Sequence, residues 1–248
     1  MDNPLHPFEL HPLVHISLFG FDISINKAVL MMWIVTIVAS GILIVAANRK
    51  GLVPTKLQSL AELLVDFIRG IILDTIGKDG MRFFPFIASL FVFILFSNLL
   101  GLIPGSYTVT SQIVVTAAFA LAVYGLSIIL GFVLHGMKFL QILVPPGTPA
   151  WLLPLMVPIE LVSQLARPVS LSVRLFANMT AGHVILGVLF GLAVAGGLLI
   201  GWLPFVFTIA MYALEVGIAF IQAYIFTVLT CVYLGDAVNL HGHESHAH

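Results

Sequence analysis

The feature that most constrains this chain is a set of apolar runs long enough to cross a lipid bilayer. Ala28 to Ala47 form a run of 20 residues without a charge. At about 1.5 Å per residue, such a helix spans a hydrocarbon core of about 30 Å. Of the 248 residues 60% are hydrophobic and only 8% are charged, whereas a soluble domain has about 25% charged residues. The sequence therefore predicts an all-α polytopic membrane protein with a single membrane domain over residues 1–248.

Apolar runs and turn residues divide the chain into about five predicted crossings. The expected segments are an outside leader at 1–27, spans at 28–47, 83–104 and 113–136, an amphipathic surface helix at 55–75, two long helices at 151–200 and 203–236, and a His-rich tail at 237–248. Each long stretch exceeds the ~20 residues of a perpendicular span. We therefore expect a tilted helical hairpin, with a kink where Pro168 removes a backbone hydrogen bond.

The basic residues predict the orientation of the chain. Six of the ten lysines and arginines lie between Asn48 and Arg82. By the positive-inside rule this segment is cytoplasmic, which puts the N-terminus outside and, after five crossings, the C-terminus in the cytoplasm. Residues 55–75 alternate apolar and charged faces at helical spacing, as in a helix on the cytoplasmic membrane surface.

Several functional classes find no support in the sequence. The net charge is −1, so no basic surface suggests a nucleic-acid partner. Cys231 is the single cysteine, which excludes an internal disulfide and a cysteine-based metal cluster. No Gly-x-x-x-x-Gly-Lys-Ser/Thr loop is present, and the His-rich tail lacks His-Glu-x-x-His. We expect no catalytic residue, no cofactor and no metal site, and a solvated tail.

The first long helix has an unusual set of polar residues. Glu160, Arg167 and Arg174 follow one another at intervals of seven, which returns a side chain to nearly the same helix face. Asn178 lies four residues beyond Arg174 and shares its face, whereas His183 falls about half a turn away. Each charge at a bilayer centre costs roughly 2.5–3.5 kcal/mol. Such residues indicate a functional site.

The second long helix repeats the pattern with Glu215 and Gln222, again seven residues apart. An acid and a histidine on neighbouring helices can pass protons, since histidine titrates near neutral pH. We therefore expect His183 to turn toward Glu215. The guanidinium of Arg174 effectively never deprotonates, so it supplies a permanent positive charge and relays no proton.

Structural ion pairs between helices are the alternative interpretation. Glu160 could pair with Arg167, and Glu215 with Arg174. Arg167 is assigned a structural role. Arg174 fits this alternative least, because the 40 residues between it and Glu215 contain His183 but no Asp, Glu, Lys or Arg, which is too sparse for a routine network of ion pairs.

Three motifs together resemble subunit a of the rotary F-type ATP synthase. Residues 174–183 read Arg-Leu-Phe-Ala-Asn-Met-Thr-Ala-Gly-His and follow Pro-Val-Ser-Leu at 168–171. Residues 215–226 read Glu-Val-Gly-Ile-Ala-Phe-Ile-Gln-Ala-Tyr-Ile-Phe, and residues 98–104 read Asn-Leu-Leu-Gly-Leu-Ile-Pro. The resemblance covers most of residues 80–236. The order of histidine first and glutamate second is that of mitochondrial and alphaproteobacterial members.

The resemblance implies a non-catalytic, proton-translocating stator subunit whose hairpin lies against a ring of c subunits, each with a membrane-embedded carboxylate. Two aqueous half-channels would lead to the ring from opposite faces, coupling proton flow to rotation and ATP synthesis. Arg174 matches the essential arginine between them. The other matching positions are Asn178, His183, Glu215 and Gln222 near the arginine and the outer half-channel, and Glu160 near the cytoplasmic one. Gly105-Ser106 stand where some relatives have acids, so no acid is expected there.

The implied partners are the c-ring, the peripheral-stalk b subunits, the remaining synthase subunits and membrane lipid. The implied location is a bacterial inner membrane, in preference to a mitochondrial one. A self-contained proton-coupled secondary transporter is the alternative, but its inverted repeats are missing because the polar features gather in the second half of the chain. An intramembrane protease has even less support, because no Gly-x-Ser-x-Gly supplies a nucleophile.

Overall fold

A computed structural model describes residues 12–14, 17–18, 21–22, 25–47, 55–103, 108–144 and 149–239. Five of its helices are long and apolar enough to cross a membrane. The predicted all-α polytopic fold is therefore confirmed. Most of the expected leader at 1–27, residues 240–248 of the expected tail and the Gly105-Ser106 turn lie outside the described residues.

The described elements follow one another in a simple order. The helices are α1 (Lys27–Ala47), α2 (Lys56–Thr75), α3 (Phe84–Gly101), α4 (Ile113–His135), α5 (Leu153–Ala195), α6 (Gly197–Ile200) and α7 (Trp202–Val238). Short 3-10 helices are η2 (Lys78–Phe83), η3 (Val109–Ser111), η4 (Gly136–Leu143) and η5 (Ala150–Leu152). Before α1, the strands β1 (Pro12–Val14), β2 (Ser17–Leu18), β3 (Phe21–Asp22) and β4 (Ile25–Asn26) pair as β1 with β4 and β2 with β3.

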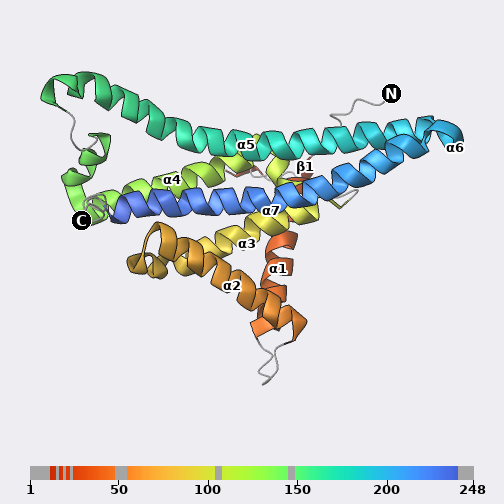
Figure 1. Cartoon of the computed structure of the whole chain (residues 1–248), viewed down its shortest axis with the longest axis horizontal. Helices are drawn as coiled ribbons and strands as arrows, with labels where there is room; N and C mark the ends of the chain where they lie inside the picture. Colours follow the sequence, from red (N-terminus) through yellow and green to blue (C-terminus); the bar gives the residue numbers. More distant parts are fainter. Residues whose placement is uncertain are drawn as a thin grey trace.

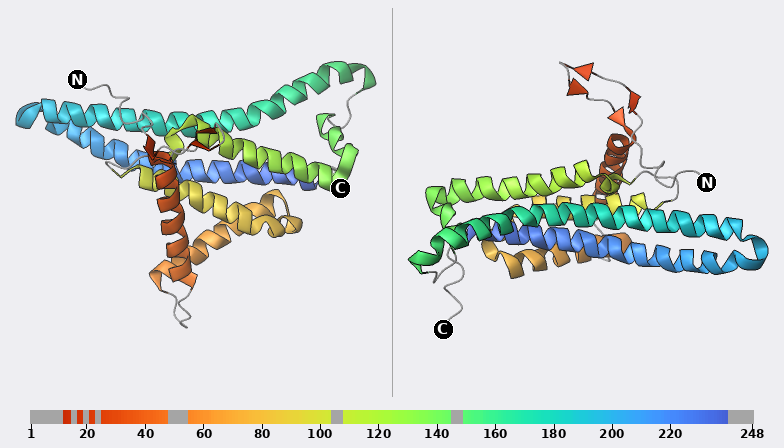
Figure 2. Two further views of the ribbon diagram at one scale, coloured as in Figure 1. Left: turned by 180° about the vertical axis from the view of Figure 1, so that it is seen from behind. Right: turned by 90° about the horizontal axis from the view of Figure 1, so that it is seen from above.

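The two longest helices, α5 and α7, run antiparallel along the molecule (Figure 1). α4 and α3 pack beside them, α2 packs against α3 and α7, and α1 projects away from the pair (Figure 2). α5 has 43 residues and is therefore ~64 Å long at about 1.5 Å per residue. Because this is about twice the hydrocarbon thickness, α5 must cross the bilayer at a steep tilt.

The expected kink at Pro168 does not interrupt the helix. α5 is continuous through both Pro158 and Pro168, and its first turns curve away from α4 and α7 (Figure 1). Proline in a helix removes one hydrogen bond, and the neighbouring turns absorb the change as a bend. The chain reverses at Gly197, whose φ of 58° lies in the left-handed region that favours glycine.

The core lies where α3 and α7 meet α2, α4 and α5. Phe226 is fully buried there. Small residues at Ala219 and Ala223 of α7 are also fully buried, and small side chains allow membrane helices to approach closely. Since lipid tails are as apolar as these side chains, close packing stabilises the contact more than the hydrophobic effect does.

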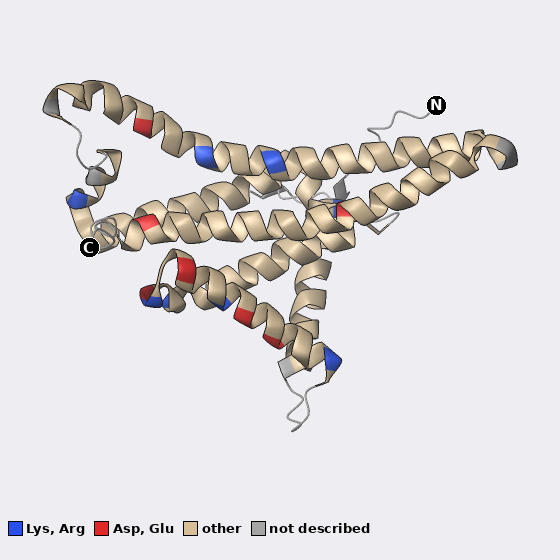
Figure 3. Cartoon of the chain, in the orientation of Figure 1, with Lys and Arg blue, Asp and Glu red and all other residues tan. Residues whose placement is uncertain are grey.

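α2 is amphipathic, as the sequence predicts. Its N-terminus is capped, and its apolar face packs against the core. Its N-cap Thr55 accepts a hydrogen bond from the Gln58 backbone N–H. Ile68 and Ile72 are fully buried against the core. Charged side chains gather along α2 and are sparse on the crossing helices (Figure 3). The helix is therefore attached to the bundle through its apolar face.

Candidate functional site

Arg174 lies in the middle of α5 and its side chain is exposed. Within the described part of the chain, no hydrogen bond or ion pair is formed by its guanidinium. Arg167, two turns earlier, differs because its Nη1 lies 3.5 Å from Asp236 Oδ2 of α7. One arginine of α5 thus has an acid within the chain, and the other faces outward.

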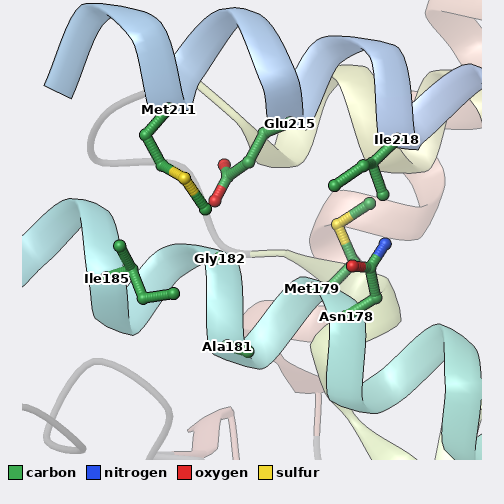
Figure 4. Close-up of a pocket in the computed structure, with 8 residues that line it drawn as sticks. All are labelled: Asn178, Met179, Ala181, Gly182, Ile185, Met211, Glu215 and Ile218. Carbon is green, nitrogen blue, oxygen red and sulfur yellow. The ribbon is translucent and has the colours of Figure 1, made fainter. Parts of the chain in front are cut away.

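Glu215 of α7 points toward the backbone of α5 at Gly182 (Figure 4). Its side chain is 6% exposed, and neither carboxylate oxygen has a hydrogen-bond partner among the described residues. A Cβ atom at Gly182 would overlap Glu215 Oε1 and lie 2.7 Å from its Cδ. The glycine therefore makes room for the acid between the two helices.

A cavity of about 150 Å³ opens beside this acid (Figure 4). Its lining residues come from both long helices: Asn178, Met179, Ala181, Gly182, Ile185, Met211, Glu215 and Ile218. One water needs roughly 10–15 Å³ of such space together with polar partners. Asn178 and Glu215 are the polar members of this lining, so the cavity lies next to an amide and an acid.

Gln222 lies two turns beyond Glu215 on α7 and is 3% exposed. Its Nε2 has no hydrogen-bond partner among the described residues. Between these two residues, the Ala219 carbonyl accepts a hydrogen bond of 3.5 Å from Asn98 Nδ2 of α3. Asn98 Oδ1 in turn accepts one of 2.9 Å from the Thr110 hydroxyl. This part of α7 is therefore lined with buried amides and hydroxyls.

A pairing of His183 with Glu215 was expected, but neither Glu215 oxygen accepts a hydrogen bond from any described residue. His183 Nε2 lies 2.6 Å from the hydroxyl of Thr108, just before η3. The Thr108 hydroxyl also donates a hydrogen bond of 3.1 Å to the Gly101 carbonyl. The rotation of α5 places Gly182 toward α7 and its neighbour His183 toward the loop after α3. His183 therefore leaves α5 in one direction, toward Thr108, whereas Glu215 of α7 approaches α5 from another, at Gly182.

Glu160 lies apart from the other predicted site residues. It accepts a hydrogen bond of 2.9 Å from Gln164 Nε2 within α5. It is 14 residues from Arg174, which is about 21 Å along a helix. The two alternative ion pairs, Glu160 with Arg167 and Glu215 with Arg174, are both absent from the described residues. Asp236 is the acid that pairs with Arg167, and sequence reasoning missed it.

Two further polar residues of the site were also missed by sequence reasoning. Thr108 and Thr110 follow the Asn98 turn and are 4% and 2% exposed. Their signal was a run of hydroxyl residues, Thr108-Val-Thr-Ser-Gln112, in a chain with few polar residues. Among the described residues, no group of three or more His, Cys, Asp or Glu side chains could hold a metal ion.

The fold and the site define a helical membrane protein that places ionisable and amide side chains at the contact between its two longest helices. Comparison with known proteins names the family: a model described as ATP synthase A chain matches residues 29–235. The chain belongs to this family.

Similar proteins match over nearly their whole length. ATP synthase subunit a of Rhodospirillum rubrum is 45% identical over 241 residues, covering 97% of this chain and 100% of the relative. ATP synthase subunit a 1 of Brucella anthropi is 48% identical over 244 residues, covering 96% and 98%. The subunit a of Agrobacterium fabrum is 48% identical over 244 residues, with the same coverage.

Family membership has direct consequences. Subunit a is a non-catalytic, membrane-spanning subunit of the F-type ATP synthase complex, and its partners are other synthase subunits. The bacterial relatives and the five apolar helices indicate a multi-pass protein of the inner membrane. The secondary-transporter alternative has no support from these findings.

Proposed function

We propose that this chain is the proton-translocating stator subunit a of the synthase, and that Arg174 is a fixed charge facing the carboxylates of a rotating c-ring. Two half-channels lead to the ring, and the arginine separates them. The observation that carries this proposal is the exposed guanidinium in the middle of α5, which has no acid partner among the described residues.

A charge in this position needs a partner from another chain. An arginine at a bilayer centre costs roughly 2.5–3.5 kcal/mol, and its guanidinium cannot lose its proton. Arg167 has the carboxylate of Asp236 3.5 Å away, whereas Arg174 has no such acid among the described residues. A membrane-embedded carboxylate on the c-ring supplies the partner that Arg174 lacks. Because the arginine keeps its charge, each ring carboxylate must release its proton before it passes.

The open apolar surface of α5 and α7 supports a large protein contact beside Arg174. In the most apolar 18-residue windows of α5 and α7, only 17% and 11% of residues are buried within this chain. Large side chains such as Val169, Val173 and Ile221 are more than 40% exposed. Two antiparallel helices with exposed apolar faces can pack against the outer surface of a ring of helical hairpins. The b subunits, the remaining synthase subunits and lipid cover other surfaces.

The outer half-channel is assigned to the cavity beside Glu215 and to His183. Both lie on the hairpin-tip side of Arg174, and the basic segment at 48–82 puts this tip outside. Asn178 lines the cavity with Glu215, and Gln222 continues the polar lining along α7. Glu160 lies toward the opposite, cytoplasmic end of α5, where the second half-channel begins.

The energy for rotation comes from the membrane potential. One elementary charge that crosses 100 mV releases about 2.3 kcal/mol. Several protons must therefore move for each ATP made elsewhere in the complex. Protons that passed directly from one half-channel to the other would cross the membrane without turning the ring. The positive charge of Arg174 opposes this direct passage.

The test is ATP-driven acidification of inverted membrane vesicles that contain Arg174→Ala, with subunit a and ring content measured by blotting. Arg167→Ala is the matched control, because it removes the same charge from the same helix face. We expect Arg174→Ala to assemble without pumping and Arg167→Ala to keep most of the pumping. Normal acidification by Arg174→Ala would contradict the proposal.

A further inference from the structure

The hydroxyl of Thr108 connects His183 of α5 to the end of α3. It lies 2.6 Å from His183 Nε2 and 3.1 Å from the Gly101 carbonyl oxygen. We propose that Thr108 is a positioning residue, which fixes the ring orientation and the tautomer of His183 for proton exchange in the outer half-channel. The inference rests on the proposed function, because it gives His183 a place on the proton route.

Thr108 is itself held firmly. It is 4% exposed, and its carbonyl accepts a hydrogen bond of 2.7 Å from the Ser111 hydroxyl and one of 3.3 Å from the Ser111 backbone N–H. Its backbone therefore cannot rotate freely. A hydroxyl in such a frame can hold an imidazole ring in one orientation.

The direction of the hydrogen bonds follows from the chemistry of the three groups. A hydroxyl has one proton to donate, and a backbone carbonyl can only accept. Since a carbonyl can only accept, the Thr108 hydroxyl gives its one proton to the Gly101 oxygen in the 3.1 Å hydrogen bond, and the Thr108 oxygen then accepts from His183 Nε2–H. In the neutral ring one nitrogen is protonated and the other accepts. The proton is therefore gained and lost at Nδ1.

Gly101 makes this arrangement possible. A Cβ atom at position 101 would lie 2.6 Å from Thr108 Cγ2 and 2.9 Å from Thr108 Oγ1. Ordinary contacts between carbon atoms are about 3.5–4.0 Å. A side chain at position 101 would therefore push the Thr108 hydroxyl away from the histidine. Gly101 at the end of α3 and Thr108 in the loop before η3 therefore act together to position the hydroxyl beside His183.

The first test compares proton pumping by four variants in inverted vesicles, at matched subunit content. Thr108→Val keeps the shape and removes the hydroxyl, and Thr108→Ser keeps the hydroxyl. Gly101→Ala keeps the hydroxyl but displaces it. Thr116→Val is the matched control, since among the described residues the buried Thr116 hydroxyl bonds to the backbone carbonyls of Gln112 and Ile113 at the start of α4 and to no side chain.

We expect about a tenfold lower pumping rate in Thr108→Val and Gly101→Ala, with near-normal rates in Thr108→Ser and Thr116→Val. A tenfold change corresponds to about 1.36 kcal/mol, the size of one net hydrogen bond. Normal pumping by Thr108→Val overturns the inference. Equal losses in Thr108→Val and Thr108→Ser also overturn it, because they show that packing matters and the hydroxyl does not.

The second test needs no change at Thr108. In ¹⁵N-histidine-labelled complex, the signals lost in His183→Gln identify His183, and their shifts distinguish the two neutral tautomers. We expect Nε2–H, and a neutral ring with Nδ1–H would overturn the inference even if Thr108→Val fails to assemble. His183→Ala distinguishes failure of the proposed proton route through His183 from failure of the proposed role of Thr108. Normal pumping by His183→Ala removes His183 from the proton route, whereas loss in His183→Ala with normal Thr108→Val removes only the role of Thr108.

Discussion

Gly182→Ala places a single methyl group at the contact between α5 and α7. The new Cβ would overlap Glu215 Oε1 and lie 2.7 Å from Glu215 Cδ. Carbon atoms in contact are normally about 3.5–4.0 Å apart. The carboxyl group must therefore retreat by about 1 Å, or the two helices must separate.

The side chain is the part that moves, because a carboxylate at the end of a flexible chain shifts more easily than two packed helices. Overpacking of a core costs typically about 1–3 kcal/mol, and a flexible neighbour puts this substitution at the low end. A displacement of about 1 Å at a reacting group can reduce a rate by about 100-fold. We therefore expect Gly182→Ala to assemble normally and to pump protons ten- to 100-fold more slowly.

The assay is ATP-driven acidification of inverted vesicles at matched subunit content. Gly187→Ala and Gly191→Ala are matched controls on the same helix, because a Cβ at either position would meet nothing within 4 Å. Alanine is a better helix former than glycine by about 0.8–1.0 kcal/mol, so both controls should assemble at least as well as the parent. Wild-type pumping by Gly182→Ala would refute the reasoning that Glu215 needs its position against α5.

Two other substitutions test the packing around the site. Arg167→Ala breaks a pair whose side chains are 36% and 38% exposed, and such exposed pairs contribute about 0–1 kcal/mol; the amount of assembled subunit in membranes should fall little, and a severe loss would contradict this. Asn98→Leu leaves the buried Thr110 hydroxyl without its acceptor, at a cost of about 1–3 kcal/mol, and removes a long hydrogen bond to the Ala219 carbonyl. The temperature at which the detergent-solubilised subunit aggregates should drop clearly in Asn98→Leu, and an unchanged temperature would show that these bonds contribute nothing.

The sequence predicts the crossings well because length and apolarity alone decide them. An uncharged run as long as 28–47 is expected to form a membrane-spanning helix, and the helix α1 covers this run. The two long stretches were likewise too long for upright spans, and they form the helices α5 and α7. The outcome at Pro168 was harder to predict: a kink was expected, but α5 is continuous there, because a helix can lose one hydrogen bond and keep the others.

The contacts of the polar residues could not be predicted in the same way. Helical spacing says which residues share a face, but the rotation of each helix is set by packing against its neighbours. His183 therefore meets Thr108, which is 75 positions away in the chain, in place of Glu215. Arg167 meets Asp236 across 69 positions. Neither partner lies at a spacing that a single helix would reveal.

The central claim is that Arg174 faces a carboxylate of another chain, and the most direct measurement is the structure of the assembled synthase in a membrane-like environment. The quantity to measure is the distance from the Arg174 guanidinium to the closest carboxylate. The account predicts a ring carboxylate within about 6 Å, the range over which opposite charges interact strongly. An Arg174 paired with Glu215 or Asp236 of its own chain, or turned to lipid with no ring acid nearby, would contradict it.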